Sequence, residues 1–313
     1  MSTAPSLLGI DLGGTKIEAR LLDAAGQERW RQRVPTPHED YDATLGAIAG
    51  LVAEARQAAG GPITVGLGTP GALAANGRMK NCNSTWLNDR PLQRDIEAAL
   101  GQPVALANDA NCLALSEATD GAGAGEEVVF AVILGTGCGA GIAVRGQVLT
   151  GPNRLAGEWG HNPLPWARVE GPDADPPYAC YCGQQGCNET YLSGSGLARD
   201  HLHVTGTALA GEAIVERAAA GDAACRATLD RHAERLARAL AAVINLLDPD
   251  VVVLGGGLSR LSHLYDEVPR RWGEWVFSGG NRDPVRTRLV ASRHGDASGV
   301  RGAAWLARGL PAR

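Results

Sequence analysis

The chain has 313 residues, of which 44% are hydrophobic and 20% are charged. This length and composition allow a full buried core, favour two lobes, and predict a soluble globular protein. The net charge of -5, with no basic block along the sequence, argues against nucleic acid as a partner.

The sequence also argues against a membrane protein and a secreted one. Its longest apolar run, 128–134, is far shorter than the roughly 20 residues that a bilayer requires. No basic residue precedes Lys16, so no signal peptide is predicted, and we expect a cytoplasmic protein. Three of the seven cysteines lie between Cys180 and Cys187, and in a chain without a secretory signal this favours a metal site over disulfides.

The N-terminal part of the chain predicts strands and helices around a glycine turn. Gly13 and Gly14 connect the first two strands into a hairpin. The predicted strands are 7–11, 17–22, 29–34, 63–67 and 104–107, and the predicted helices are 42–59 and 91–100. The strand 104–107 delivers Asn108 and Asp109 to the start of another helix, which ends near Gly121.

The second part repeats this theme. Residues 121–127 indicate a hinge, and a glycine loop follows the strand 128–134. Further on, the sequence predicts a strand at 142–145, a long helix at 223–247, a strand at 251–254 and a last helix at 298–310. Two similar glycine hairpins predict two similar α/β lobes: a small one over 1–120, joined by the C-terminal segment 298–313, and a large one over 121–297.

Three glycine-rich loops are candidates for nucleotide binding. In loop 11–16 the glycines allow backbone N–H groups to approach phosphate oxygens, and Asp11 is available to hold a Mg²⁺-bound water; the alternative is a plain hairpin turn. Loop 135–141 does not open into a helix as a dinucleotide loop must, so it fits a second phosphate clamp better. The glycines at 255–257 leave room for adenine and ribose, or make an ordinary helix start. Together the loops favour an ATP cleft between two lobes.

The cysteine cluster predicts zinc. Cys180, Cys182 and Cys187 follow His161, and three thiolates with one imidazole complete a closed tetrahedral shell with no open position for a catalytic water. The alternative is a set of reduced thiols and a core histidine.

Carboxylates accompany these features. Glu158 and Glu189 flank the zinc ligands, where fixed acceptors suit the hydroxyls of a sugar; the alternative is solvated surface acids. Asp109 stands where a strand meets a helix. It is suited to accept the proton of an attacking hydroxyl while Asn108 orients the sugar, although a lone aspartate there is also a common helix cap.

The ordered motifs resemble the ROK family of bacterial sugar kinases over residues 8–305. The motifs are GIDLGGTK at 9–16, PG at 70–71, LANDAN at 106–111, LGTGCGAG at 134–141, GEWGH at 157–161, CYCGQQGCNE at 180–189 and DPDVVVLGGG at 248–257. The resemblance implies the two-lobed actin-like ATPase fold, also called ribonuclease H-like, with an ATP/sugar cleft between the lobes. It also implies ATP, Mg²⁺ and structural Zn²⁺ as cofactors, a free sugar as partner, and a homodimer.

The resemblance also implies the role of each site residue. Asp109 is expected to be the catalytic base, and His161 to bind zinc through one ring nitrogen and a sugar hydroxyl through the other. The predicted substrate contacts are Gly71, Asn83, Asn108, Asp109, Glu158, His161 and Glu189, and the zinc ligands are His161, Cys180, Cys182 and Cys187. The predicted nucleotide contacts are Gly9, Ile10, Asp11, Leu12, Gly13, Gly14, Thr15, Lys16, Gly135, Thr136, Gly137, Cys138, Gly139, Ala140, Gly141, Ile142, Gly255, Gly256 and Gly257.

Within the family, three motifs resemble the fructokinase, or manno(fructo)kinase, branch: NSTWLN at 83–88, FAVILGTGCGAG at 130–141 and GEWGHNPLPW at 157–166. They predict the conversion of D-fructose to fructose 6-phosphate, with N-acetylglucosamine kinase and glucokinase as alternatives. The family's transcriptional repressors place a helix-turn-helix before the first glycine loop, which here begins at Gly9, so the repressor alternative is disfavoured.

Overall fold

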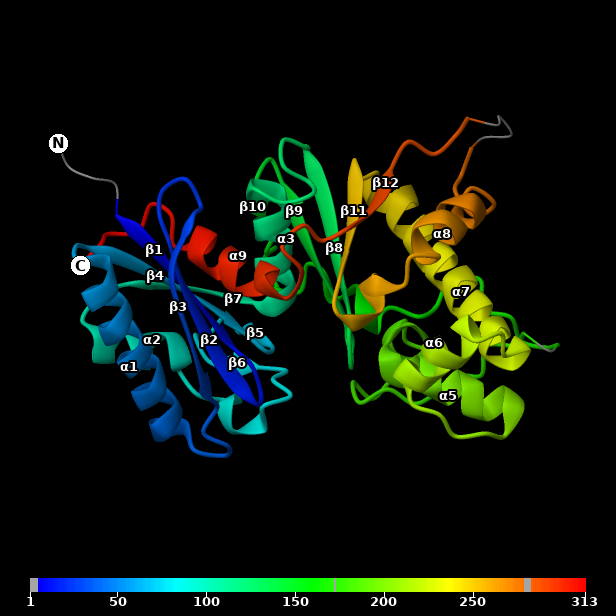
Figure 1. Ribbon diagram of the computed structural model, residues 1–313, viewed down its shortest axis with the longest axis horizontal. Coiled ribbons are helices and arrows are strands. Elements are labelled where there is room, and N and C mark those ends of the chain that lie inside the picture. Colours follow the sequence, from blue (N-terminus) through cyan, green and yellow to red (C-terminus); the bar gives the residue numbers. More distant parts are fainter. Residues whose placement is uncertain (1–4, 172, 279–282) are drawn as a thin grey trace. The chain divides into compact units, whose positions relative to one another are not determined.

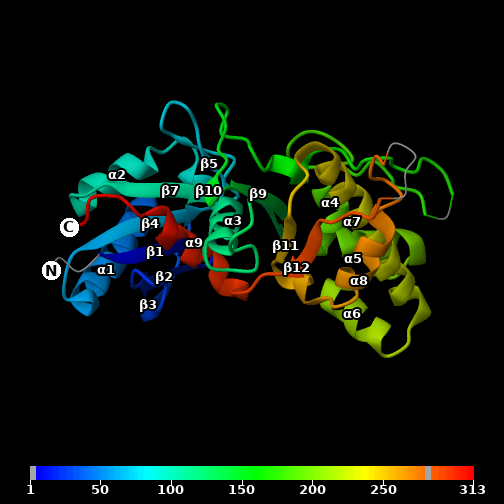
Figure 2. The same ribbon diagram turned by 90° about the horizontal axis from the view of Figure 1, so that it is seen from above.

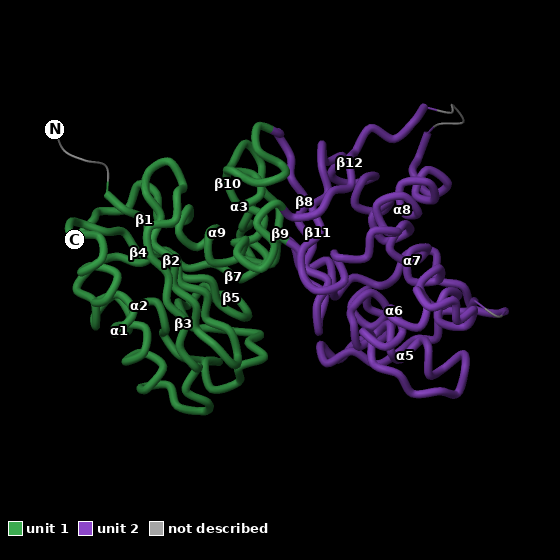
Figure 3. Tube along the Cα trace, viewed as in Figure 1, with its two compact units in different colours: residues 1–125, 141–156, 293–313 green, residues 126–140, 157–292 purple. Residues whose placement is uncertain are grey.

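The computed structural model describes residues 5–171, 173–278 and 283–313, which form two compact units (Figure 3). Residues 1–4, on which part of the signal-peptide prediction rests, lie outside the described residues. The first unit contains 1–125, 141–156 and 293–313, and the second contains 126–140 and 157–292. The division predicted from sequence differs in assigning 141–156 to the second lobe. Within the described segments, no helix is long and apolar enough to cross a membrane.

The first unit is built on a mixed sheet with the strand order β3-β2-β1-β4-β7. Its strands are β1 (Ser6–Leu12), β2 (Lys16–Leu22), β3 (Glu28–Pro35), β4 (Ile63–Thr69) and β7 (Val104–Asn108). The predicted glycine hairpin joins β1 and β2 in antiparallel register, whereas β1, β4 and β7 run parallel. The carboxyl ends of these three strands therefore meet at one edge of the sheet.

Helices cover both faces of this sheet (Figure 1). Leu8, Ile10 and Leu12 alternate along β1 and join the core beneath α1 (Tyr41–Ala59). The opposite face receives α9 (Ser298–Leu306), and here the strands carry glycine: a Cβ on Gly9 would overlap the Val300 carbonyl. Glycine at this position thus lets α9 lie directly on the strand. Other elements of this unit are β5 (Ala72–Leu73), β6 (Met79–Lys80), η1 (Thr85–Leu87), α2 (Leu92–Leu100), α3 (Asp109–Thr119) and η4 (Gly295–Ala297).

The second sheet has the order β10-β9-β8-β11-β12. Its strands are β8 (Val128–Leu134), β9 (Cys138–Val144), β10 (Gln147–Val148), β11 (Val251–Gly255) and β12 (Arg288–Ala291). The strand β11 is buried throughout and pairs in parallel with both β8 and β12, as its run of valines predicts.

Helices of the second unit surround one long helix, α7 (Ala223–Leu247), seen from a second direction in Figure 2. Asp222 caps its start by accepting the N–H groups of Ala224 and Cys225. The other helical elements here are η2 (Glu158–His161), α4 (Glu189–Leu192), α5 (Gly194–Thr205), α6 (Gly211–Ala219), η3 (Gly257–Arg260) and α8 (Leu264–Trp272). The predicted helix 223–247 is confirmed. The predicted helix 298–310 is too long, because α9 ends at Leu306.

Candidate functional site

Polar residues collect at the carboxyl edge of the first sheet. In the parallel register Asp11 lies opposite Gly68, and Thr69 lies opposite Asn108. Asp11, at the end of β1, and Asn108, at the end of β7, are therefore brought to the same edge, where open α/β sheets bind ligands.

Asp109 is the first residue of α3. Asn108 caps this helix by accepting the N–H of Asn111 at 2.8 Å, and the Asp109 carboxylate accepts the N–H of Ala110 at 2.8 Å. The Asp109 side chain is nevertheless exposed. Capping is thus performed by Asn108, which leaves the Asp109 carboxylate at a helix N-terminus that favours its negative charge.

Asp11 and Asp109 are close enough to affect each other. Burial raises the pKa of Asp11 to about 7, and the negative charges of Asp109 and Glu18 add to the shift while Lys16 opposes it. Asp11 is half-buried beside this second carboxylate, and carboxylate oxygen is the ligand that Mg²⁺ prefers.

The turn after β1 is held in a fixed shape. The N–H of Gly13 donates to the Lys16 carbonyl at 3.0 Å, and the Thr36 hydroxyl donates to the Gly13 carbonyl at 2.7 Å. Gly14, Thr15 and Lys16 are exposed. By contrast, Gly9, Ile10 and Leu12 point into packed regions, so only their backbone groups are available for the predicted nucleotide contacts.

The two predicted sugar contacts that follow β4 lie in adjoining segments. Gly71 has a φ of 75°, and a Cβ there would overlap the backbone of Lys80, so the chain after β4 packs directly on that segment. Two residues further, Cys82 and Asn88 exchange hydrogen bonds, with the Cys82 N–H donating at 2.9 Å and the Asn88 amide donating at 3.0 Å. This pair closes a loop that presents Asn83 at the surface.

The second glycine loop joins β8 to β9, as predicted. The N–H of Gly135 donates to the Gly137 carbonyl at 3.0 Å, and Glu189 accepts the N–H of Cys138 at 3.0 Å. A Cβ on Gly137 would lie 2.8 Å from the same carboxylate of Glu189. Glu189, predicted as a sugar contact, therefore also holds the glycine loop in place. In the same stretch Cys138 and Ala140 are buried, and Thr136 and Gly137 are exposed.

The third glycine group follows β11. Gly255 ends the strand, and Gly256 has a φ of 81°, with a position for Cβ that the Leu134 backbone occupies. Gly257 begins η3 and has open space where a side chain would be. Glycine is thus required by packing at Gly256, and leaves room at Gly257.

The element η2 places Glu158 and His161 beside β9. A Cβ on Gly160 would overlap the Cys138 carbonyl, so this turn lies directly on the strand. The buried Trp159 anchors it by donating to the Ala239 carbonyl at 3.3 Å. Close packing therefore fixes Glu158 and His161 relative to the glycine loop.

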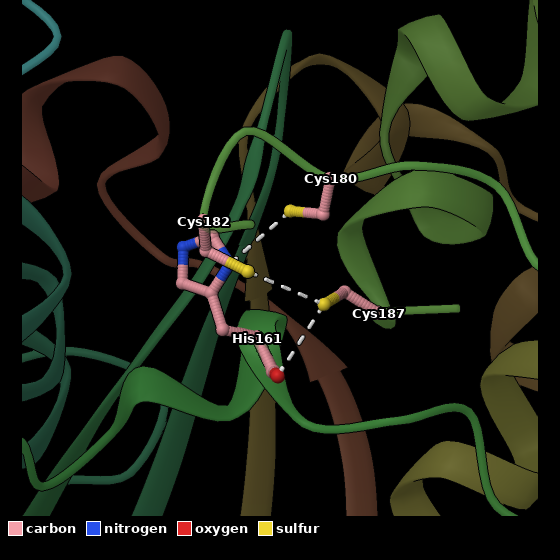
Figure 4. A group of neighbouring side chains, drawn as sticks. All are labelled: His161, Cys180, Cys182 and Cys187. Atoms are coloured by element: carbon pink, nitrogen blue, oxygen red, sulfur yellow. Dashed lines mark hydrogen bonds between the residues drawn. The ribbon is translucent and has the colours of Figure 1, made fainter. Parts of the chain in front are cut away.

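The four predicted zinc ligands converge (Figure 4). Their ligand atoms lie within 4.8 Å of one another. Cys182 Sγ lies 3.6 Å from Cys187 Sγ, and Cys180 Sγ lies 3.5 Å from His161 Nδ1. A tetrahedral zinc with ordinary bond lengths requires about 3.8 Å between two sulfurs and about 3.6 Å between sulfur and nitrogen. The side chains thus fit a zinc ion with His161 bound through Nδ1.

The other ring nitrogen of His161 has a different neighbour from the sugar hydroxyl that the resemblance implies. His161 Nε2 lies 3.0 Å from the hydroxyl of Tyr181, rather than being open to a sugar. The two rings also meet edge to face, with centroids 5.1 Å apart. Tyr181 was not among the predicted site residues, and the only sequence signal for it is its position between two zinc ligands.

The architecture is that of the actin-like ATPase fold. It has two α/β units, a glycine turn after the first strand of each sheet, and a pair of carboxylates at one sheet edge. The sequence model of the ROK family matches residues 7–309. The chain belongs to the ROK family.

Individual relatives extend this result. The N-acetyl-D-glucosamine kinase of Yersinia enterocolitica is 39% identical over 95% of this chain and 98% of that protein. The crystal structure of a ROK hexokinase from Thermus thermophilus is similar with a TM-score of 0.83, 32% identity, and coverage of 96% of this chain and 97% of that one. A ROK glucokinase from Streptomyces griseus, solved with glucose and AMPPNP, has a TM-score of 0.76, 31% identity, and coverage of 97% and 99%. The predicted fold is confirmed.

Proposed function

We propose that this protein is an ATP-dependent N-acetyl-D-glucosamine kinase. The observation that carries the substrate is the 39% identity, over nearly the full length of both chains, to a protein with that name. In the proposed reaction a sugar hydroxyl, most simply the primary one at C6, attacks the γ-phosphorus of ATP. A new O–P bond forms, the bond to the leaving ADP breaks, and the hydroxyl proton passes to a base.

Asp109 is the proposed base. Asp109 is exposed at the N-terminus of α3, where its carboxylate accepts the N–H of Ala110, and Asn108 caps the helix through the N–H of Asn111. Asn108, Glu158 and Glu189 are proposed as sugar contacts, with Gly71 and Asn83 from the segments after β4. Glu189 in addition fixes the glycine loop through the Cys138 N–H.

ATP and Mg²⁺ are the proposed cofactors of the glycine turns. The fixed turn after Asp11 and the loop at 135–141 offer backbone N–H groups to phosphates, and Gly257 leaves room for the rest of the nucleotide. When bound, Mg²⁺ neutralises phosphate charge. Asp11, at the carboxyl end of β1, is the proposed residue that holds it through water.

Zinc is the proposed structural cofactor of His161, Cys180, Cys182 and Cys187. The bound ion would use all four of its positions on the protein and would fix the geometry of the segment between His161 and Glu189. In this proposal zinc supports the sugar contacts and takes no part in proton transfer.

D-Fructose is the second candidate substrate, because the motifs at 83–88 and 157–166 resemble fructokinases. We rank it behind N-acetylglucosamine, because relatives about 40% identical to this chain are named N-acetyl-D-glucosamine kinases. Glucose is a third candidate substrate, because the structure is similar to that of the Streptomyces griseus glucokinase.

The test is a coupled ATP-turnover screen of free hexoses, with a mock preparation from cells that lack this protein as a control for contaminating kinases. We expect N-acetylglucosamine to give the highest kcat/KM. A preference for fructose or glucose would overturn the substrate, and the absence of turnover above the control with every hexose would overturn the kinase assignment itself.

A further inference from the structure

The segment 162–188, which carries the three cysteines, is held by a buried group of charges as well as by its own ligands. Charged residues of the segment pair with α7, whose arginines also pair with Asp200 on α5 of the same unit. We refer to this group as the ion-pair cluster: Asp175, Asp200, Arg231, Glu234, Arg235 and Arg238.

Asp175 is the centre of this ion-pair cluster. Its carboxylate accepts Arg235 Nε at 2.6 Å and a terminal nitrogen of Arg238 at 2.9 Å. The side chains of Asp175 and Arg238 are 0% exposed and that of Arg235 is 2% exposed. A second carboxylate, that of Asp200 on α5, accepts Arg235 at 2.6 Å. Removing one partner from such a buried pair is strongly destabilising, because it leaves an uncompensated charge.

The ion-pair cluster contains three carboxylates and three guanidinium groups, and the exposed Arg168 adds a fourth guanidinium by pairing with Glu234 at 2.9 Å. Burial alone would raise the pKa of Asp175, but the N–H of Arg168 and the guanidinium groups of Arg235 and Arg238 outweigh burial and lower it. Asp175 is therefore ionised at neutral pH.

Arg235 and Arg238 also donate hydrogen bonds to backbone carbonyl groups at two places in the segment. Arg238 Nη1 donates to the Trp166 carbonyl at 2.7 Å and to the Pro165 carbonyl at 3.3 Å. Arg235 Nη2 donates to the Ala174 carbonyl at 3.2 Å. These contacts lie after His161 and before Cys180 in the chain. The helix α7 thus fixes the segment between the first zinc ligand and the second.

We propose that Asp175, Arg235 and Arg238 are positioning residues that hold the 162–188 segment in the shape in which the four zinc ligands converge, and thereby set the affinity of the protein for zinc. The free energy of zinc binding includes the cost of ordering its ligands. A segment whose backbone is already held at 165–166 and 174–175 loses less conformational entropy when zinc binds. The further effect of these residues on sugar affinity rests on the proposed function, whereas their effect on zinc affinity does not.

The experiment measures the dissociation constant for zinc by competition with a chromophoric chelator, in wild type and in Asp175→Asn. The control is Asp230→Asn, which makes the same chemical change on α7 at an exposed ion pair with Arg271. We expect the constant to rise about 10- to 100-fold in Asp175→Asn, the range seen when groups that orient metal ligands are changed. In the control it should stay at the wild-type value.

A purely stabilising role is distinguished by thermal unfolding with and without zinc. Such a role lowers Tm equally in both states, whereas positioning reduces the rise in Tm that zinc produces. If Asp175→Asn does not fold, the same measurements are made on Arg238→Lys. Lysine keeps the positive charge but lacks the planar guanidinium group that binds Trp166 and Asp175 at the same time. An unchanged zinc affinity in a variant with wild-type far-UV circular dichroism would overturn the proposal. Recovery of a raised sugar KM by excess zinc would support its extension to sugar binding, and a raised KM that zinc does not restore would overturn that extension alone.

Discussion

Asp11→Asn is expected to stabilise the protein while impairing its reaction. Burial, with help from the neighbouring Asp109, raises the pKa of Asp11 from 3.8 to about 7. The folded state therefore binds a proton that the unfolded state releases at lower pH, so the free energy of unfolding falls as pH rises from about 4 to about 7. Asparagine resembles the neutral carboxyl and does not titrate, so the free energy of unfolding of the variant does not fall in this way as pH rises.

The size of the effect follows from the shift. A change of about 3 pKa units at about 1.4 kcal/mol each corresponds to about 4 kcal/mol once Asp11 is fully ionised. This is the upper limit of the gain expected for Asp11→Asn at about pH 8. Between about pH 6 and about pH 8, the free energy of unfolding should fall by about 1.4 kcal/mol more in the wild type than in the variant.

The assay is urea unfolding of both proteins, free of nucleotide and metal, at the two pH values. Asp89→Asn is the control, because the Asp89 side chain is 85% exposed and its replacement should leave the pH dependence unchanged. Turnover with MgATP should fall in Asp11→Asn, since the proposed metal-holding carboxylate is lost. A variant that is no more stable than wild type at the higher pH, with the same pH dependence, would refute the reasoning.

Three further outcomes test other parts of the site. Asp109→Asn should lower kcat by about 10²- to 10⁴-fold, the usual effect of losing a general base, with little change in sugar Kd by calorimetry; near-normal turnover would leave Asp109 without a catalytic role. Cys182→Ala should lower both zinc content by metal analysis and sugar affinity, and active protein without zinc would contradict this. Gly160→Ala should cost about 1–3 kcal/mol in urea unfolding, because its Cβ would overlap the Cys138 carbonyl. Gly46→Ala is its control, as open space surrounds that position on α1, and equal effects of the two would refute the packing argument.

Features encoded within short stretches could be predicted from the sequence. The glycine hairpin after Asp11 and the strand-to-helix passage at Asp109 depend on neighbouring residues, and the structure has both. The convergence of the four proposed zinc ligands could also be predicted, because three cysteines lie within eight positions and only one imidazole had to be found. The helix 223–247 followed from its apolar periodicity.

Features that depend on distant partners could not be predicted. Arg235 and Arg238 appear in the sequence as the polar face of a helix, yet both are buried, because Asp175 lies some sixty positions away and no local pattern connects them. Neither the nine-residue α6 nor the four-residue β12 was predicted, and β12 is too short to show a clear period. The identity of the sugar was beyond the motifs as well, since it depends on the geometry of hydroxyl contacts rather than on residue types.

The unusual state of Asp11 follows from how closely α9 and α3 pack. A Cβ on Gly302 would overlap the Cys112 carbonyl, so glycine allows these two helices to touch through their backbones. One turn earlier, a Cβ on Gly299 would lie 3.8 Å from Asp11 Oδ2. Asp109, the first residue of α3, lies within electrostatic reach of Asp11 and adds to the rise in its pKa. Close packing by the small residues of α9 thus raises the pKa of Asp11. Any substitution that moves α9 outward should lower that pKa and weaken the coupling between Asp11 and Asp109.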